Sequence, residues 1–222
     1  SFIGKIAFFA VILGVLLIVA AVVWMQEAER RIPVQYAKRV VGRKMYGGQS
    51  TFIPLKVAMA GVIPIIFAMS ILSFPATIVG LFGQPAAGSF WAKFVGLFST
   101  NSWFYAILYF LLIIFFTYFY TSIQFNPIEM ANNMKKNGGF VLGIRPGKPT
   151  SDFISKVLSK VTLIGAVILG IIAVLPLALS GVSGINIGIG GPSILIVVSV
   201  ALETVKSLES QMLMRHYKGF LE

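Results

Sequence analysis

The chain has 222 residues, of which 57% are hydrophobic and only 11% are charged, whereas an ordinary soluble domain has about 25% charged residues. This composition excludes a large soluble core and indicates a polytopic membrane protein. Eighteen Lys and Arg against seven Asp and Glu give a formal net charge of +11, which favours basic cytoplasmic loops or a partner that carries phosphates or carboxylates. The chain has no cysteine, which excludes disulfides, thiolate nucleophiles and cysteine-ligated metals.

The first apolar run extends from Ile6 to Met25 without a charged residue. It is too long for the apolar region of a signal peptide, and no small-residue cleavage site follows it. We therefore predict a membrane-spanning helix over residues 4–25.

Long stretches without charge predict four further spans at about 20 residues per crossing. These spans are 57–80, 102–124, 159–180 and 193–213. The last is the weakest, because Glu203, Lys206 and Glu209 fall in its second half. Glu203 and Lys206 are three residues apart and can pair on one helical face.

The connections between the spans alternate in charge. The loops at 26–56 and 125–158 contain most of the Lys and Arg, whereas the other two connections contain only Lys93. The positive-inside rule places the two long loops and the C-terminus in the cytoplasm and the start of the chain outside. Since a chain that starts outside with Ser1 lacks a leader, we expect a fragment without its N-terminal part. An odd number of spans suits one half of an inverted repeat.

Each long loop has a local pattern. Residues 31–49 alternate between apolar and polar on each side of Gly42–Arg43, which predicts a short β-hairpin with basic residues near its tip. The run GIRPGKP at 143–149 is rich in glycine and proline. It makes a helix there improbable and predicts a turn that presents Arg145.

No catalytic or metal-binding constellation is found in the sequence. Asp152 and Glu129 lie in a basic loop without a nearby His or Cys, and the lone His216 lies near the end of the chain. The run GIGGPS at 188–193 lacks the Lys and Ser/Thr of a phosphate loop, so we interpret it as a turn. We expect no enzymatic activity and no cofactor.

The second span is interrupted by a glycine and two prolines, at Gly61, Pro64 and Pro75. Such kinks are tolerated where neighbours or a water-filled cavity satisfy the freed carbonyls. Ile66, Ser70 and Phe74 are four residues apart and share one face. This face is either an ordinary packed one, with the hydroxyl bonded back to its own helix, or a functional surface. The cores of the first four spans contain no Asp, Glu, Lys, Arg or His, which disfavours an ion-coupled carrier.

Three segments closely resemble the SecY family, the channel subunits of the Sec protein translocon. They are YAKRVVGRKMYGGQSTFIPLKVAMAGVIPIIFAMSILSFPATI at 36–78, FNPIEMANNMKKNGGFVLGIRPGKPT at 125–150 and GGPSILIVVSVALETVKSLESQMLMRHYKGFLE at 190–222. The resemblance covers nearly the whole chain and corresponds to helices six to ten of the family. It implies an all-α polytopic membrane protein whose five transmembrane helices form one half of a pseudo-twofold inverted-repeat channel.

The resemblance also implies site residues. Ile66 and Ile196 would belong to the apolar pore ring, and Ser70 and Phe74 would line the lateral gate. Ala58 stands where the family often has Asn, which implies a more apolar seam across this gate.

The family's cytosolic loops dock a motor or a ribosome. Lys38, Arg39, Arg43 and Lys44 match the basic tip of the first of these loops, and Arg145 matches the family's important arginine in the second. An arginine held on a rigid turn suits a phosphate or carboxylate partner, because its planar fork makes two-point contacts.

The resemblance therefore implies a passive protein-conducting channel in the bacterial inner (plasma) membrane. It would pass unfolded secretory polypeptides across the membrane and release transmembrane segments laterally into lipid. The implied partners are the N-terminal half of the channel, SecE-like and SecG-like subunits, the SecA motor or the ribosome through rRNA phosphates, signal peptides, nascent chains and anionic lipid. The alternatives are half of a small-solute secondary transporter, with its site at the broken helix, or a structural subunit whose basic loops bind anionic lipid.

Overall fold

The computed structural model describes residues 2–36, 39–41, 44–46, 50–83, 89–99, 102–183 and 191–218. The helices in these residues are α1 (Phe2–Glu27), α2 (Ile63–Phe82), α3 (Phe90–Leu97), α4 (Trp103–Gln124), α5 (Pro127–Lys136), α6 (Lys148–Ser183) and α7 (Gly191–Lys218). The strands are β1 (Glu29–Tyr36), β2 (Arg39–Val41), β3 (Lys44–Tyr46), β4 (Ser50–Lys56) and β5 (Gly139–Val141).

Each of the five predicted spans coincides with a long helix. Within the described residues, three stretches are long and apolar enough to cross a membrane, namely Ile63–Phe82, Trp103–Lys136 and Lys148–Ala178. In α1, the apolar stretch among the residues whose side chains are described is Ile12–Glu27. The membrane crossings and the exact limits of all five spans remain predictions.

Two expectations about helix ends were wrong. The fourth long helix, α6, begins at Lys148 inside the predicted turn. Pro149 is accommodated there because the first turn of a helix has no intrahelical partners for its N–H groups. The helix α2 begins at Ile63, after a turn in which Gly61 has a φ of 58°. Pro64 therefore starts this helix, and only Pro75 lies inside it.

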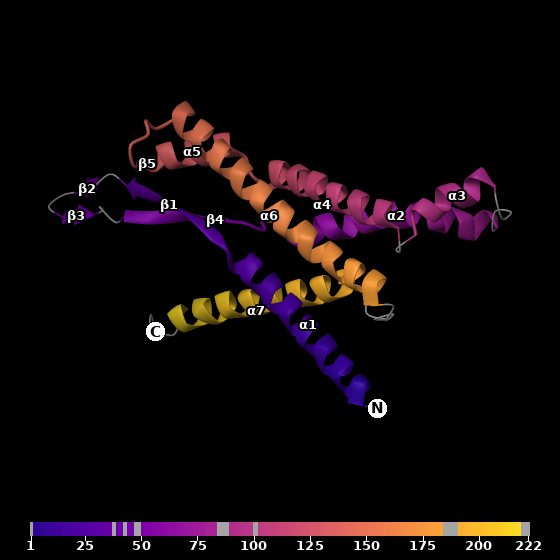
Figure 1. The fold of residues 1–222 in the computed structure, drawn as a ribbon. Coiled ribbons are helices and arrows are strands. Elements are labelled where there is room, and N and C mark those ends of the chain that lie inside the picture. Colours follow the sequence, from indigo (N-terminus) through magenta and orange to yellow (C-terminus); the bar gives the residue numbers. More distant parts are fainter. Residues whose placement is uncertain are drawn as a thin grey trace.

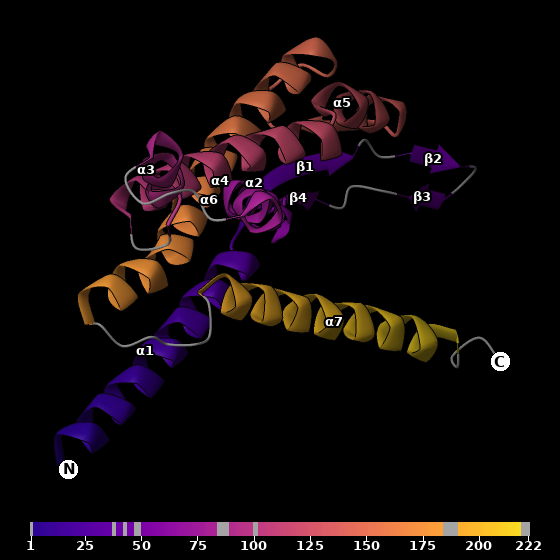
Figure 2. The ribbon, with the colours of Figure 1, turned by 90° about the vertical axis from the view of Figure 1, so that its right-hand side faces the viewer.

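The main apolar core lies where α1, α2, α4, α6 and α7 meet. Its fully buried members include Val22, Ile65, Tyr109, Ala173 and Leu195, one from each helix. The helix α4 packs most extensively against α6 and α2 (Figures 1 and 2). The helices α1 and α7 cross each other beside this group (Figure 1).

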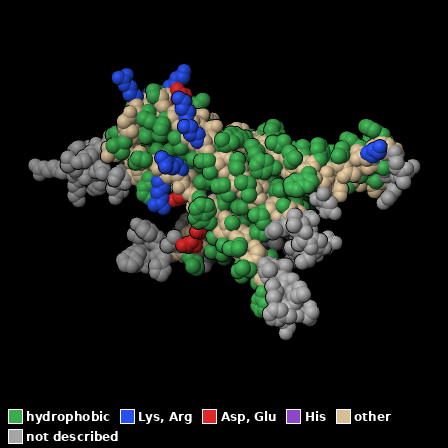
Figure 3. Space-filling model, in the orientation of Figure 1, with side chains coloured by type: hydrophobic (Ala, Val, Ile, Leu, Met, Phe, Trp, Pro, Cys, Tyr) green, Lys and Arg blue, Asp and Glu red, His purple; other side chains and the backbone are tan. Residues whose placement is uncertain are grey.

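The two ends of the molecule differ in composition. The strands, α5 and the C-terminal end of α7 lie toward one end, while the N-terminus and α3 lie toward the other (Figure 1). On the face shown in Figure 3, Lys and Arg gather mainly at the end that carries the strands, and apolar side chains cover the region between the ends. The fold thus separates a basic end, hereafter the sheet end, from an apolar body.

Candidate functional site

The helix α2 has one buried and one uncovered face. Ile65 and Leu72 are fully buried, whereas Ile66 is 43% and Phe74 is 63% exposed. Ser70, between the latter two, is also exposed, and its Oγ donates a 2.7 Å hydrogen bond to the carbonyl of Ile66. The hydroxyl therefore bonds back to its own helix, but the face is not packed within the described chain. It presents apolar side chains and a hydroxyl that is already satisfied.

Hydrogen bonds from a side-chain hydroxyl to a carbonyl of the same helix recur around Pro75 of α2. The hydroxyl of Ser73 donates to the carbonyl of Ser70 at 3.0 Å, and the hydroxyl of Thr77 donates to the carbonyl of Ser73 at 3.0 Å. Pro75 has no N–H, so the carbonyl of Ile71 lacks its usual helical partner. Because their hydroxyls bond to the helix backbone, these residues suit an apolar environment in spite of their polarity.

The second predicted pore residue, Ile196, lies in a different environment. It is partly buried and packs against the main core, next to the fully buried Leu195 of α7. The same helix passes the start of α2, since a Cβ on Gly61 would lie 3.4 Å from Oε1 of Glu203. A pore ring that contains both Ile66 and Ile196 stays a prediction.

The predicted pairing of Glu203 with Lys206 was wrong. Lys206 Nζ instead lies 3.8 Å from Oε1 of Glu27 at the end of α1. A second contact between these helices joins the Gln26 amide, as donor, to the hydroxyl of Ser199, which is buried. These polar residues of α7 therefore face α1, and the tertiary crossing takes precedence over the pairing within the helix.

The predicted hairpin in the first loop is confirmed. Strands β1 and β4 pair antiparallel from Glu29↔Lys56 to Gln35↔Ser50, and β2 pairs with β3 through Arg39↔Tyr46 and Val41↔Lys44. The pair Gly42–Arg43 falls between β2 and β3. Of the predicted docking residues, Arg39 and Lys44 lie in these strands, and their side chains are outside the described part of the structure. Lys38 and Arg43 lie outside the described residues altogether.

The two long loops are joined into one sheet, a feature that no local sequence pattern predicts. Strand β5 of the second loop pairs with β1 through Val34↔Val141 and Tyr36↔Gly139, so the strand order is β4-β1-β5. The ring of Tyr36 lies against Gly139, where a Cβ would be 2.8 Å from its Cε1. A second apolar core lies beneath the sheet and contains Ile32, Val34, Leu55, Met134, Val141 and Ile154.

Arg145 is exposed on a turn that is fixed on both sides. Gly143 and Gly147 flank it with φ values of 79° and 109°, in the region that favours glycine. The hydroxyl of Thr150 donates a 2.8 Å hydrogen bond to the carbonyl of Arg145. The backbone N–H groups of Thr150 and Ser151 both donate to the carbonyl of Gly147 at 3.1 Å. Thr150 is 2% exposed, and no pattern in the sequence points to it.

Ala58 lies in the turn before α2 and packs against the main core. Its methyl group contributes no polar contact. The side of α2 that faces α4 is instead aromatic, since the ring centroid of Phe67 lies 5.7 Å from that of Phe116 and 5.5 Å from that of Tyr120. The helix α4 therefore packs against α2 through these aromatic side chains.

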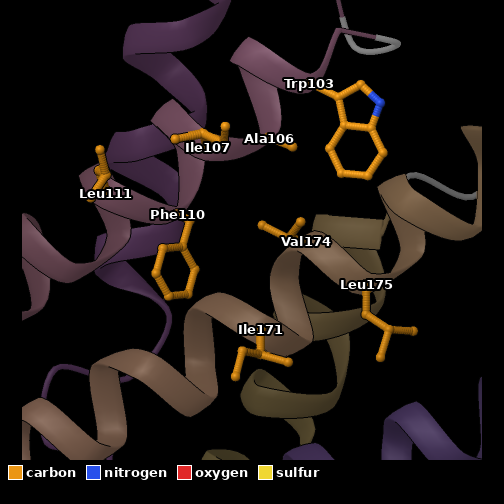
Figure 4. Close-up of a pocket in the computed structure, with 8 residues that line it drawn as sticks. All are labelled: Trp103, Ala106, Ile107, Phe110, Leu111, Ile171, Val174 and Leu175. Carbon is orange, nitrogen blue, oxygen red and sulfur yellow. The ribbon is translucent and has the colours of Figure 1, made fainter.

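A groove of about 390 Å³ lies between α4 and α6 (Figure 4). Its lining is apolar and consists of Trp103, Ala106, Ile107, Phe110, Leu111, Ile171, Val174 and Leu175. This lining offers no convergent polar groups for a small polar solute, which a transporter site would need. Among the described residues, no three His, Asp or Glu side chains are grouped closely enough to hold a metal ion.

Comparison with known proteins identifies relatives along the whole chain. The family model described as SecY matches residues 2–205. The "Protein translocase subunit SecY" of Mycobacterium tuberculosis (strain ATCC 25618 / H37Rv) is 52% identical over 228 residues, which cover 99% of this chain and 52% of the relative. The protein of the same name from Streptomyces coelicolor is 53% identical over 222 residues, which cover 98% of this chain and 50% of the relative. The chain thus spans about half the length of these relatives.

Solved structures share the fold. The structure titled "The structure of a protein conducting channel" matches with a TM-score of 0.61 and 19% identity over 90% of this chain and 49% of that chain. A second, titled "The plug domain of the SecY protein stablizes the closed state of the translocation channel and maintains a membrane seal", matches with a TM-score of 0.59 and 19% identity over the same shares. From the family match and the identity to these relatives, the chain belongs to the SecY family.

Proposed function

We propose that this chain forms the C-terminal half of a protein-conducting channel. The channel passes unfolded secretory polypeptides across the membrane and releases transmembrane segments laterally into lipid. The observation that carries the proposal is the uncovered face of α2, where Ile66 and Phe74 are exposed while Ile65 is fully buried. The relatives named protein translocase subunits support the same activity.

The proposed pore ring uses Ile66 and Ile196 together with residues of the N-terminal half. Branched apolar side chains cannot replace the hydration shell of an ion, so a narrow ring of them resists leakage. The same side chains can change rotamer and widen the ring around an extended polypeptide. No chemistry is needed at this point, which fits a passive channel without a cofactor.

The proposed lateral gate uses Ser70 and Phe74 on the uncovered face of α2. A signal sequence or transmembrane segment would leave the pore along this face. Since the Ser70 hydroxyl is already bonded to Ile66, the face costs little to expose to an apolar segment. The aromatic contacts of Phe67 keep the other side of α2 on α4 while the gate face changes partner.

The proposed docking surface lies at the sheet end and faces the cytoplasm. Arg145 contributes from the second loop, and Lys38, Arg39, Arg43 and Lys44 contribute from the first. Ribosomal RNA would meet these cations through its phosphates, with strong salt dependence. The SecA motor would meet them through acidic or polar surface. The N-terminal half and SecE-like and SecG-like subunits complete the assembly in a bacterial inner membrane.

The test uses the full-length channel that contains this half, reconstituted in proteoliposomes. The variant Arg145→Glu is compared with wild type for SecA-driven preprotein import and for ribosome binding. Lys135→Glu, an exposed lysine in the last turn of α5, is the charge-matched control. We expect Arg145→Glu to lose import while inserting normally, and Lys135→Glu to retain it. Unchanged import and binding in Arg145→Glu would leave its loop as a topological determinant only.

A further inference from the structure

The short helix α3 lies at the end of the molecule opposite the strands (Figure 1). It follows α2 and precedes α4, two helices that are long and apolar enough to cross a membrane. Its sequence, FWAKFVGL, is mostly aromatic and aliphatic, yet none of its residues is buried. The helix therefore exposes apolar surface that the described chain does not cover.

Aromatic contacts fix α3 beside the ends of both long helices. The ring centroid of Phe94 lies 5.2 Å from that of Phe98, which in turn lies 6.0 Å from that of Phe104 in the first turn of α4. On the side of α2, Trp91 lines an apolar cavity of about 290 Å³. The residues of α2 that line this cavity with it are Ile78, Val79 and Phe82. The helix α3 thus lies at the level where α2 ends and α4 begins.

The sides of α3 differ in exposure and polarity. At about 100° per residue, four exposed apolar side chains fall within one arc about 120° wide. This apolar arc consists of Leu97, Phe90, Phe94 and Trp91. Lys93 and Gly96 lie beside the arc and are also exposed. Ala92 and Val95 are half-buried on the remaining side. The helix therefore has one side toward the protein, one apolar side and one polar side.

The chemistry around the apolar arc indicates a lipid interface as its partner. Between residues 57 and 128, Lys93 is the only charged residue. The arc adjoins exposed apolar side chains at the ends of the two long helices, namely Leu81, Phe82 and Trp103. The medium that surrounds those helix ends therefore also meets α3. A membrane boundary offers hydrocarbon to the arc and water to the lysine at the same time, and aromatic side chains are enriched at that depth.

We propose that α3 is an interfacial helix, which lies in the membrane boundary of the leaflet opposite the sheet end and anchors the end of α2 there. The side chains of Phe90, Phe94 and Leu97 enter the upper part of the hydrocarbon, to a depth of about 5–10 Å. Lys93 extends its ammonium group to the headgroup level. The inference rests on the proposed membrane placement of α2 and α4 and not on transport activity.

The test places single nitroxide spin labels on the full-length channel in phosphatidylcholine bilayers. This chain has no cysteine, so single cysteines in it can be labelled once the other half is also free of cysteine. Collisions with oxygen report hydrocarbon, and collisions with a water-soluble nickel chelate report water. We compare Phe90→Cys and Phe94→Cys with Lys93→Cys and Gly96→Cys. A Cβ on Gly96 would meet no neighbouring atom within 4 Å, so the label needs no repacking there.

We expect the ratio of oxygen to nickel collisions to be about twofold or more higher on the apolar arc than at Lys93 and Gly96. Ile107→Cys on α4 is the membrane reference and Phe52→Cys on β4 is the water reference, since both side chains are exposed. Equal ratios around α3 would overturn the proposal. If neither reagent reaches the arc, a protein partner covers it and the proposal is wrong.

The reference positions separate this inference from the proposed function. A ratio at Ile107 like that at Phe52 would contradict the membrane placement of α4, and the inference would fail with it. Lost transport together with the expected pattern of ratios would count against the proposed channel activity alone and would support the interfacial helix.

A second arm tests the anchoring of α2. The label is placed at Leu81→Cys, which is exposed at the end of this helix. Replacing both Phe90 and Phe94 by serine removes apolar surface from the arc. We expect this change to raise the nickel collision rate at Leu81 about twofold or more. Gly96→Ser adds a hydroxyl beside the arc and should leave the label unchanged. A label at Leu81 that ignores the double serine variant would overturn the anchoring.

Discussion

The hydroxyl of Thr150 donates a 2.8 Å hydrogen bond to the backbone carbonyl of Arg145. Thr150 is buried in the first turn of α6, whereas Arg145 is exposed on the preceding turn. The long helix thus fixes the backbone that carries the proposed docking arginine. We therefore expect Thr150 to position Arg145, so that docking of a partner would cost less loop entropy.

Replacing Thr150 by valine should weaken docking without removing a charge. The substitution keeps the buried shape but leaves the Arg145 carbonyl without this partner, at a cost of about 1 kcal/mol. We expect SecA-driven import by the full-length channel to fall to a level between wild type and Arg145→Glu. Thr150→Ser keeps the hydroxyl and should import like wild type. If valine and serine behave alike, the hydrogen bond has no part in positioning Arg145.

Alanine at two glycines of α6 should destabilise the fold by different amounts. A Cβ on Gly170 would lie 2.6 Å from Cδ2 of Phe110, a ring that can shift, whereas one on Gly165 would meet the backbone carbonyl of Val57. We expect Gly170→Ala to cost about 1–3 kcal/mol and Gly165→Ala to cost more. Gly80→Ala in α2 is the control, because a Cβ there would meet no neighbouring atom within 4 Å. Thermal unfolding of the full-length channel in detergent measures all three, and equal shifts would contradict the expected order.

Adjacent isoleucines of α2 should respond differently to asparagine. Ile66 is 43% exposed, and Ile65 is fully buried. In the full-length channel, we expect Ile66→Asn to raise ion conductance across planar bilayers with little change in thermal stability, because a polar ring residue can hydrate an ion. Ile65→Asn should instead lower stability by about 1–3 kcal/mol, since it buries an amide that has no hydrogen-bond partner. A channel that stays as tight to ions with Ile66→Asn as wild type would remove Ile66 from the pore ring.

The two polar contacts between α1 and α7 should contribute unequally. Ser199 is 1% exposed and accepts from the amide of Gln26, so Ser199→Ala leaves that amide without its partner. We expect a loss of about 1–3 kcal/mol in the free energy of unfolding. Lys206→Met should change it by less than about 0.5 kcal/mol, because the ion pair with Glu27 is solvent-exposed. Thermal unfolding tests the order, and a larger effect of Lys206→Met would contradict it.

The predictable parts of the fold are those with a strong local signal. Long apolar stretches located all five long helices, and alternation around Gly42–Arg43 located the hairpin. The start of α6 was missed because proline and glycine also occur at the first turn of a helix, where Pro149 is tolerated. The three residues of β5 were missed because so short a strand has no periodicity of its own and forms only by pairing with β1.

In the candidate site too, only the features with a local sequence signal could be predicted. The shared face of Ile66, Ser70 and Phe74 follows from helical spacing, but only the tertiary structure distinguishes it from the packed face that starts at Ile65. Thr150 carries no sequence signal, since its hydroxyl bonds to a carbonyl five residues earlier in the chain. Such roles depend on contacts between elements, which spacing along the chain does not encode.

The pairing of β5 with β1 has a mechanical consequence. Strand β1 continues from α1, β4 leads into α2, and β5 leads through the Arg145 turn into α6. The sheet therefore connects the ends of three long helices, and the strands β2 and β3 lie between β1 and β4 along the chain. A force applied at the tip of that hairpin would be divided among α1, α2 and α6 instead of bending one loop. We therefore expect a partner that docks at the hairpin to shift α2, the helix that carries the proposed gate.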